Sequence, residues 1–471
     1  MIRKINLDNY KCFKNSGDIE IKPLTLLCGI NSSGKSTVIK SLLTLKQTYE
    51  NSGEKHGLVL NSEYVKNGSF SDVSYMHSES EISVTNEFKI NRPTQYDHRG
   101  KIEITAFKNI AKMYANYGKI QHIIIRVKNT FKPIESDNML IRQNYEINVV
   151  YEDGKAIVSS VEFLKKKSNW DITIHNFPNK NDELIPDMKL MKVACYFENF
   201  RVVNLYVKNT IPPTHEVVYI VNNICTISRY TGNLYQNIHY LTPLRVYPQR
   251  TYLSDDEIID VGLGGENTAQ YLSYFQHRSI KALGFCPPDA IVTKPTLGNY
   301  VNKWMEYLGI GTYNVANNGE TVRLNINGNN VINVGFGVSQ ALPILVSGLT
   351  MRVADTLLLE QPEIHLHPKA QMAIGDFLVS LANFGKCAVV ETHSDHIINR
   401  IVKRIMDGTI NQDDVAIYFV ENSDVCSKIS LVEVDMIKGI VDAPEEFFTQ
   451  FATELSEIFK IGMDNLKKKR N

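Results

Sequence analysis

Residues 24–37 of the chain read LTLLCGINSSGKST, and the segment from Gly29 to Thr37 matches the pattern G-x-x-x-x-G-K-[ST]. Residues 24–28 are mainly apolar and predict a short buried strand, whereas residues 37–49 carry apolar side chains at helical spacing. A glycine-rich loop between a strand and a helix presents backbone N–H groups that bind phosphate. The stretch therefore predicts a P-loop that binds a nucleoside triphosphate.

Two residues of this loop have specific predicted roles. Lys35 is expected to reach the β- and γ-phosphates, and the Ser36 hydroxyl is expected to bind a magnesium ion. A glycine-rich turn that matches by chance is disfavoured, because a strand and a helix flank the loop in the required order. The other loop residues predicted to bind the nucleotide are Gly29, Asn31, Ser32, Ser33, Gly34 and Thr37.

The composition indicates a globular protein with more than one folded unit. The chain has 471 residues, of which 43% are hydrophobic and 22% are charged, and this length predicts two or three folded units. Its 51 basic and 51 acidic residues give a net charge of zero. The overall charge therefore gives no sign of nucleic-acid binding, although a local basic patch stays open.

The cysteines and the hydrophobic pattern predict a cytoplasmic location. Seven cysteines are scattered without a C-x-x-C pair, which argues against a disulfide framework and for a reducing compartment. We find no run of 18 apolar residues and no signal-peptide core at the N-terminus. The sequence therefore predicts no contact with a membrane.

The chain divides into four predicted parts. Residues 1–53 contain the P-loop, and residues 54–235 form an insertion of mixed β and α character with short β runs such as residues 122–127 and 145–151. Residues 236–435 resume a strand-and-helix alternation that includes a buried strand at residues 387–391, and residues 436–471 end the chain. We expect an α/β fold in which helices cover a mixed or parallel central sheet, interrupted by a large α+β insertion. The last part predicts a helix and a basic tail, with an apolar face made of Phe447, Phe448, Phe451, Leu455, Ile458 and Phe459.

An acidic residue that could serve the metal ion ends a second predicted strand. The run Thr356-Leu-Leu-Leu-Glu360 is apolar up to its terminal carboxylate, which can lie beside a bound nucleotide. It continues as Gln361-Pro-Glu-Ile-His-Leu-His-Pro368. This continuation makes the motif specific.

Together these motifs resemble those of the ATP-binding-cassette-type ATPases, in the branch shared by RecF, SMC and OLD proteins. The chain is most similar to bacterial AAA-family ATPases with a C-terminal DUF3696 domain, such as those of anti-phage defence systems like Septu. The resemblance covers the first fifty and roughly the last 230 residues, and the insertion matches in position only. The matching segments are residues 29–37, 240–250 (YLTPLRVYPQR), 265–268 (GENT), 335–340 (GFGVSQ), 360–368 (EQPEIHLHP) and 390–396 (VETHSDH).

The resemblance implies an enzyme that hydrolyses ATP to ADP and phosphate with Mg²⁺ between two paired heads. Gly337, Ser339 and Gln340 occupy the signature-motif position and would contact a nucleotide bound by the partner subunit, unless the turn only caps a helix. His393 matches the switch histidine that contacts the γ-phosphate. Gln249 matches a glutamine that contacts magnesium and water, but an ordinary surface glutamine explains it equally well.

Two arginines and one glutamine leave alternatives open. Arg245 and Arg250 could contact phosphate, couple the lobes, bind nucleic acid, or form structural salt bridges. Relatives carry a catalytic glutamate directly after the magnesium-binding acid, whereas this chain has Gln361, which is a poor general base. Either Glu363 contributes, or hydrolysis is slow and ATP acts mainly by closing a dimer, which is the hypothesis we favour.

The histidines also permit a metal-site interpretation, which we disfavour. His365, His367, His393 and His396 could form a zinc or nuclease centre only if their side chains converged.

Partners are inferred from the family resemblance alone. We expect a homodimer or a higher oligomer, with a separate effector, a nuclease, because 471 − 393 = 78 residues after His393 leave little room for a nuclease domain in the same chain. DNA is a further candidate partner. The alternative function is a RecF-like DNA-repair clamp that needs no effector enzyme.

Overall fold

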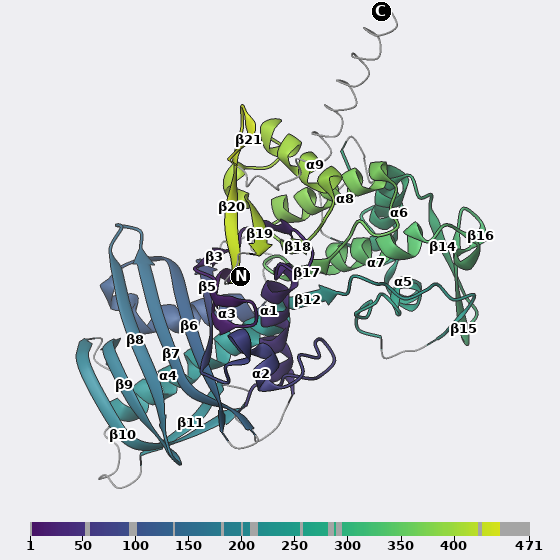
Figure 1. Cartoon of the computed structure of the whole chain (residues 1–471). Helices are drawn as coiled ribbons and strands as arrows, with labels where there is room; N and C mark the ends of the chain where they lie inside the picture. Colours follow the sequence, from purple (N-terminus) through teal and green to yellow (C-terminus); the bar gives the residue numbers. More distant parts are fainter. Residues whose placement is uncertain are drawn as a thin grey trace, which may run out of the picture.

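The structure is a computed structural model that describes residues 2–51, 57–93, 101–134, 137–179, 183–198, 201–207, 215–254, 258–280, 287–288, 294–422 and 426–442. Its strands form three sheets, of ten, seven and four strands. Helices cover the seven-stranded sheet, whereas much of the ten-stranded sheet extends to the other side of the molecule (Figure 1). The predicted α/β class is confirmed, with a mixed central sheet.

The seven-stranded sheet is the central sheet of the α/β unit. Its order is β12-β17-β18-β4-β19-β20-β21, and β12 to β19 are parallel whereas β20 and β21 are antiparallel. Because parallel strands end at the same edge of a sheet, the ends of β17, β18 and β4 lie together there. The strands are β4 (Leu24–Gly29), β12 (Ile238–Leu241), β17 (Thr356–Glu360), β18 (Cys387–Glu391), β19 (Val415–Asn422), β20 (Ser427–Asp435) and β21 (Gly439–Asp442).

Each face of this sheet is buried under a different set of helices. Side chains that point to one face, such as Leu27 and Val389, pack with the apolar side of α1 (Lys35–Glu50). Their neighbours Leu26 and Val390 point to the other face and pack with a second group of helices. Burial on both faces explains why these strands are continuous apolar runs that are recognisable in the sequence. The second group consists of α5 (Thr268–Phe275), α6 (Leu297–Leu308), α7 (Gly337–Thr350), α8 (Pro368–Asn383) and α9 (Asp395–Met406).

The ten-stranded sheet is antiparallel and contains strands from both the first part of the chain and the insertion. Its main path is β11-β10-β9-β8-β7-β6-β5-β1-β2, and β3 pairs with β1. Helices α3 (Lys101–Met113) and α4 (His215–Leu234) pack on one face. The strands are β1 (Ile2–Tyr10), β2 (Phe13–Asn15), β3 (Ile19–Glu20), β5 (Ile82–Asn91), β6 (Ile120–Ile134), β7 (Asp137–Tyr151), β8 (Ala156–Lys166), β9 (Asn169–Pro178), β10 (Leu184–Glu198) and β11 (Arg201–Val207).

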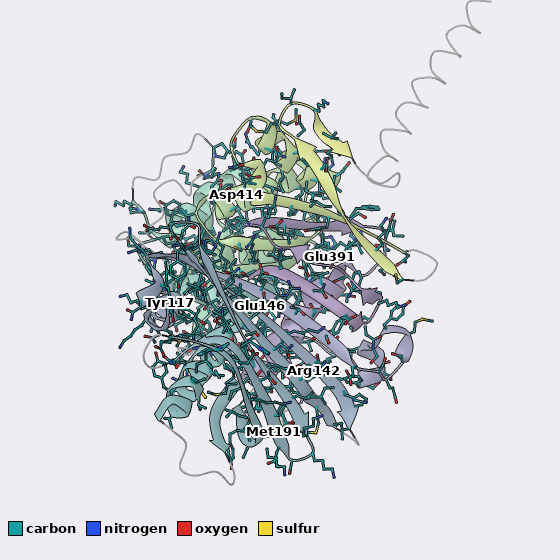
Figure 2. All side chains as sticks on the ribbon, turned by 90° about the vertical axis from the view of Figure 1, so that its left-hand side faces the viewer. Tyr117, Arg142, Glu146, Met191, Glu391 and Asp414 are labelled. Atoms are coloured by element: carbon teal, nitrogen blue, oxygen red, sulfur yellow. The ribbon has the colours of Figure 1, made fainter. Side chains whose placement is uncertain are left out.

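The opposite face of this sheet carries polar and charged side chains. Figure 2 shows it from the side on which Arg142 and Glu146 of β7 project toward the viewer. Arg142 lies 3.4 Å from Glu162 on the adjacent strand. Such a pair of opposite charges on neighbouring strands is a favourable cross-strand contact.

The insertion contains longer strands than the sequence predicted. The expected short β runs extend into strands of 15 residues in β6, β7 and β10. Outward polar residues between the apolar ones weaken the sequence signal without breaking the backbone ladder. These strands join β1 in one sheet, and the division of the chain at residues 53, 235 and 435 stays a prediction. The predicted helix of residues 447–459 and the tail Lys467–Arg470 lie outside the described residues.

A small sheet and a short helix complete the described part of the chain. The small sheet contains β13 (Tyr252–Leu253), β14 (Tyr313–Asn317), β15 (Thr321–Ile326) and β16 (Asn329–Asn330). The short helix is α2 (Phe70–Val73). Within the described ranges, every helix is too short or too polar to cross a bilayer.

Candidate nucleotide site

The loop between β4 and α1 requires glycine at two positions. Gly29 has φ +137°, and a Cβ atom there would lie 2.1 Å from the carbonyl oxygen of Val420 on β19. Gly34 has φ +108°, and a Cβ atom there would lie 2.4 Å from the Cys12 sulfur. A side chain at either position would collide with its neighbour and strain the backbone. The two spaced glycines of the motif therefore have a direct structural cause.

Two polar residues of the loop, Lys35 and Ser33, are buried. Lys35 is only 3% exposed, and its ammonium donates hydrogen bonds to the carbonyl oxygens of Gly29, at 3.0 Å, and of Ile30. The Ser33 hydroxyl is buried without a hydrogen-bond partner. A buried hydroxyl of this kind would be stabilised by donating a hydrogen bond to a phosphate oxygen. Asn31 and Ser32 are exposed on the loop.

Electrostatics at Lys35 link it to the acids around the loop. Burial lowers the pKa of Lys35, and the negative charges of Glu391 and Glu363 oppose that shift. A phosphate oxygen carries more charge than a neutral backbone carbonyl, so it is a stronger acceptor for this ammonium. Thr37 has a different contact: its hydroxyl accepts a hydrogen bond from the Cys12 thiol at 3.6 Å.

Two carboxylates lie side by side next to the P-loop. Glu360 at the end of β17 and Glu391 at the end of β18 are register partners, and β18 lies between β17 and β4. Glu360 is 6% exposed and accepts a hydrogen bond of 2.7 Å from the Tyr240 hydroxyl. Glu391 is 5% exposed, and its carboxylate interacts with the Ser36 hydroxyl. Its Oε2 is buried without a hydrogen-bond partner among the described residues.

These contacts perturb the acid on β18. Burial raises the pKa of Glu391, the neighbouring charge of Glu360 adds to the rise, and the bond from Ser36 opposes it. Glu391 and Tyr240 were not predicted from the sequence as site residues. The signal for Glu391 was present, because it ends an apolar strand in the same way as Glu360.

A buried arginine holds the turn that follows Glu360. The Arg245 guanidinium is 3% exposed and donates to the carbonyl oxygens of Glu360 at 3.1 Å and Gln361 at 3.2 Å. Burial lowers its pKa to about 10. Gln361 has φ +45°, and its N–H donates to the carbonyl oxygen of Glu391 at 2.8 Å. Arg245 therefore has a structural role through backbone contacts, and Arg250 is exposed.

Glu363 holds the segment that carries the predicted switch histidine. Its two carboxylate oxygens accept hydrogen bonds from the His393 N–H at 2.7 Å and the Thr392 hydroxyl at 2.8 Å. Burial raises the pKa of Glu363 despite these bonds. Burial and the charge of Lys35 lower the pKa of His393, so its imidazole is neutral at physiological pH. These contacts favour a role for Glu363 in positioning His393. They disfavour a role as general base.

The predicted signature residues lie at the start of α7. Ser339 donates to the carbonyl oxygen of Phe336 at 2.7 Å, and α7 begins without a side-chain cap. The Gln340 amide is fully buried, and neither its oxygen nor its nitrogen has a partner. The ring of Phe336 packs against Tyr247 at 4.6 Å and against His365 at 4.9 Å between centroids. Because no side chain caps the N-terminus of α7, helix capping alone does not explain these residues.

The remaining predicted residues have separate contacts. Gln249 is exposed, and only its backbone N–H is bonded within the described contacts, to the Tyr252 hydroxyl at 3.1 Å. His367 caps α8, because its Nδ1 accepts a hydrogen bond from the Lys369 N–H at 3.3 Å. The Nε2 atom of His396 lies 3.9 Å from Oδ1 of Asp395. Among the residues that the structure describes, we find no group of three or more His, Cys, Asp or Glu side chains placed to hold a metal ion.

Three solved structures of SMC head domains are similar to this chain along most of its length. An Smc head bound to the C-terminal winged-helix domain of ScpA has 12% identity and a TM-score of 0.40, covering 92% of this chain and 98% of that one. The SMC head domain of Thermotoga maritima has 10% identity and a TM-score of 0.37, covering 92% and 99%. A Pyrococcus furiosus Smc head with an extended coiled coil, bound to the C-terminal domain of ScpA, has 11% identity and a TM-score of 0.40, covering 98% and 99%.

A family model extends over most of the chain. No curated protein sequence matches the chain. The family model described as an AAA ATPase domain matches residues 1–236 and 290–398, which include the P-loop, Glu360 and His393. Of the residues described above, Tyr240, Arg245 and Gln249 lie between the two matched segments. The chain therefore belongs to the AAA ATPase domain family.

Proposed function

We propose that the protein binds and slowly hydrolyses ATP with Mg²⁺, and that two of its heads pair around the nucleotide to control a partner protein. The observation that carries this proposal is the convergence of Lys35, Ser36, Glu360 and Glu391 at the ends of three neighbouring strands. An ammonium, a hydroxyl and carboxylates at a helix N-terminus are the groups that bind a metal-bound triphosphate.

The donor set fits a magnesium ion. Ser36 and Glu360 would hold it, and Gln249 is a further proposed ligand from the loop after β12. When bound, magnesium would neutralise phosphate charge. Mg²⁺ needs only one or two protein carboxylates because phosphate oxygens and waters complete its shell, so a site with few acidic ligands is sufficient.

The other residues explain why hydrolysis would be slow. Lys35 would bind the terminal phosphates, and the neutral imidazole of His393 would contact the γ-phosphate. Gln361 could orient the attacking water but would not accept its proton. Glu363 is already bonded to Thr392 and His393. ATP would therefore act mainly as a ligand that closes the dimer.

A mixing experiment tests the composite site. Lys35→Ala removes the residue that binds the nucleotide in its own subunit, whereas Ser339→Glu places a carboxylate against the nucleotide of the partner subunit. Each variant alone is expected to be inactive in phosphate release. A one-to-one mixture should recover about a quarter of wild-type activity, because half of the dimers are mixed and each of these keeps one intact site. A mixture as inactive as its components would contradict the shared site.

Replacing Gln361 with glutamate is expected to increase turnover at least about tenfold. The new carboxylate would supply the general base that the wild type lacks, an effect usually worth about 10²-fold to 10⁴-fold when the geometry is right. Phosphate release at saturating ATP measures it, with Gln412→Glu at an exposed position as the control. Equal turnover in wild type and Gln361→Glu would show that another group already serves as base.

The finer proposal concerns the partner. From the motif resemblance we propose a separate effector nuclease in anti-phage defence, acting in the cytoplasm, where the six described cysteines would stay free thiols. A RecF-like DNA clamp is less supported, because Arg126 and Arg142 on the open sheet face are already paired with Asp18 and Glu162. Salt-dependent DNA binding that requires ATP would reverse this preference.

A further inference from the structure

The acid on β18 has contacts that a purely structural carboxylate would not have. The Glu391 carboxylate interacts with the Ser36 hydroxyl, and its Oε2 is buried without a hydrogen-bond partner in the described part of the chain. A buried carboxylate oxygen without a hydrogen bond is costly. By contrast, both oxygens of the nearby Glu363 accept hydrogen bonds from protein groups. Glu391 therefore has a carboxylate oxygen next to the P-loop that is available to bind a ligand.

The neighbours of Glu391 indicate what that oxygen can bind. Glu360 is its register partner across β17 and β18, so two carboxylates lie together with Lys35 as the close cation. A triphosphate would bring several more negative charges to the same place. Only a bound cation can bring these groups together without strong repulsion.

The contact with Ser36 also has a chemical consequence. When the Ser36 hydroxyl donates a hydrogen bond to Glu391, the lone pairs of its oxygen are left to bind a metal ion. The carboxylate then fixes the direction of a metal ligand, as outer-shell partners do in other metal sites. Mg²⁺ accepts one or two carboxylates beside phosphate oxygens and waters.

We propose that Glu391 is a second carboxylate of the magnesium site, which orients the Ser36 hydroxyl and, together with Glu360, binds the cation that accompanies the nucleotide. The inference rests on the proposed binding of ATP with Mg²⁺. It adds an acidic residue that neither the P-loop pattern nor the Thr356–Glu360 strand indicates. It also gives the two-strand pairing of acids a function.

Nucleotide affinity with and without Mg²⁺ tests this role independently of turnover. A fluorescent ATP analogue is titrated into wild type and Glu391→Gln, once with Mg²⁺ and once with EDTA. In Glu391→Gln, affinity with Mg²⁺ should fall by roughly tenfold or more, as expected for a residue of a metal site. In EDTA its affinity should rise, because a negative charge facing the phosphates has been removed. The affinity for Mn²⁺ in the presence of the nucleotide, measured by electron paramagnetic resonance, should fall in parallel.

The control is a buried acid beside the neighbouring strand. Asp355 immediately precedes β17, is 5% exposed and accepts from the Arg352 N–H at 2.9 Å. Asp355→Asn should leave the ratio of the two affinities unchanged. Glu391→Asp keeps the charge and should recover part of the Mg²⁺ effect, which a change in folding would not explain.

Three results separate the inference from the function on which it rests. Equal Mg²⁺ dependence in wild type and Glu391→Gln would overturn the role of Glu391 alone. A uniform loss of affinity in both buffers would also overturn it, since that is the behaviour of a residue needed only for folding. Failure of the wild type to bind the analogue with Mg²⁺ would instead overturn the proposed function.

Discussion

Replacing Lys35 with alanine is expected to reduce ATP affinity and phosphate release at least about 100-fold. Removal of one preorganised donor to a developing negative charge typically costs 10² to 10³ in rate. The loss should be larger here because Glu391 and Glu363 lie near Lys35. Without the ammonium, their negative charges would repel the phosphates unopposed. Titration with a fluorescent ATP analogue and a phosphate-release assay measure the two effects.

The control for this change is a lysine on an exposed helix face. Lys403 of α9 is exposed, and Lys403→Ala should leave both affinity and turnover at wild-type values. The melting temperature of Lys35→Ala should stay close to that of the wild type, because its ammonium bonds only to loop carbonyls. Affinity within about threefold of wild type would contradict the assignment of Lys35 to the phosphates.

Replacing Gly29 with alanine is expected to destabilise the fold by at least about 3 kcal/mol. The added Cβ atom would lie 2.1 Å from the Val420 carbonyl oxygen, and the backbone at φ +137° is already unfavourable for any other residue. The neighbouring strand must move, which breaks the close pairing of β4 with β19. Urea unfolding followed by circular dichroism measures the loss.

A second glycine provides the comparison for this change. No atom lies within 4 Å of the Cβ position at Gly335, so Gly335→Ala should change the free energy of unfolding by less than about 0.5 kcal/mol. If Gly29→Ala unfolds at the same urea concentration as Gly335→Ala, then close packing against β19 does not limit this position.

The sequence was sufficient for the parts of the site that follow a local rule. The P-loop, the strand before it and the helix after it were predicted because glycine spacing and apolar periodicity act within about fifteen residues. The strand Cys387–Glu391 was likewise predicted at its observed bounds. Both of its faces are buried, so its pattern is an unbroken apolar run.

The contacts between distant segments could not be predicted in the same way. Arg245 and Glu360 are separated by more than a hundred residues, and only the folded sheet reveals that the guanidinium holds the turn after Glu360. The partner of Ser36 was missed for the same reason, since Glu391 reaches it through the order of strands. The length of the insertion strands was underestimated because their open face is polar, which dilutes the apolar signal of β6 and β7.

The tight hairpin between β8 and β9 offers an attachment point for a spectroscopic probe. Lys167 and Ser168 form its exposed turn, and Lys166 pairs directly with Asn169, so the two strands hold the turn rigidly. Strands β5, β6 and β7 separate this hairpin from β1. A dye coupled at this turn would therefore move as one body with the ten-stranded sheet. Energy transfer between two such dyes would follow the approach of two heads in real time, without a reporter group in the nucleotide site.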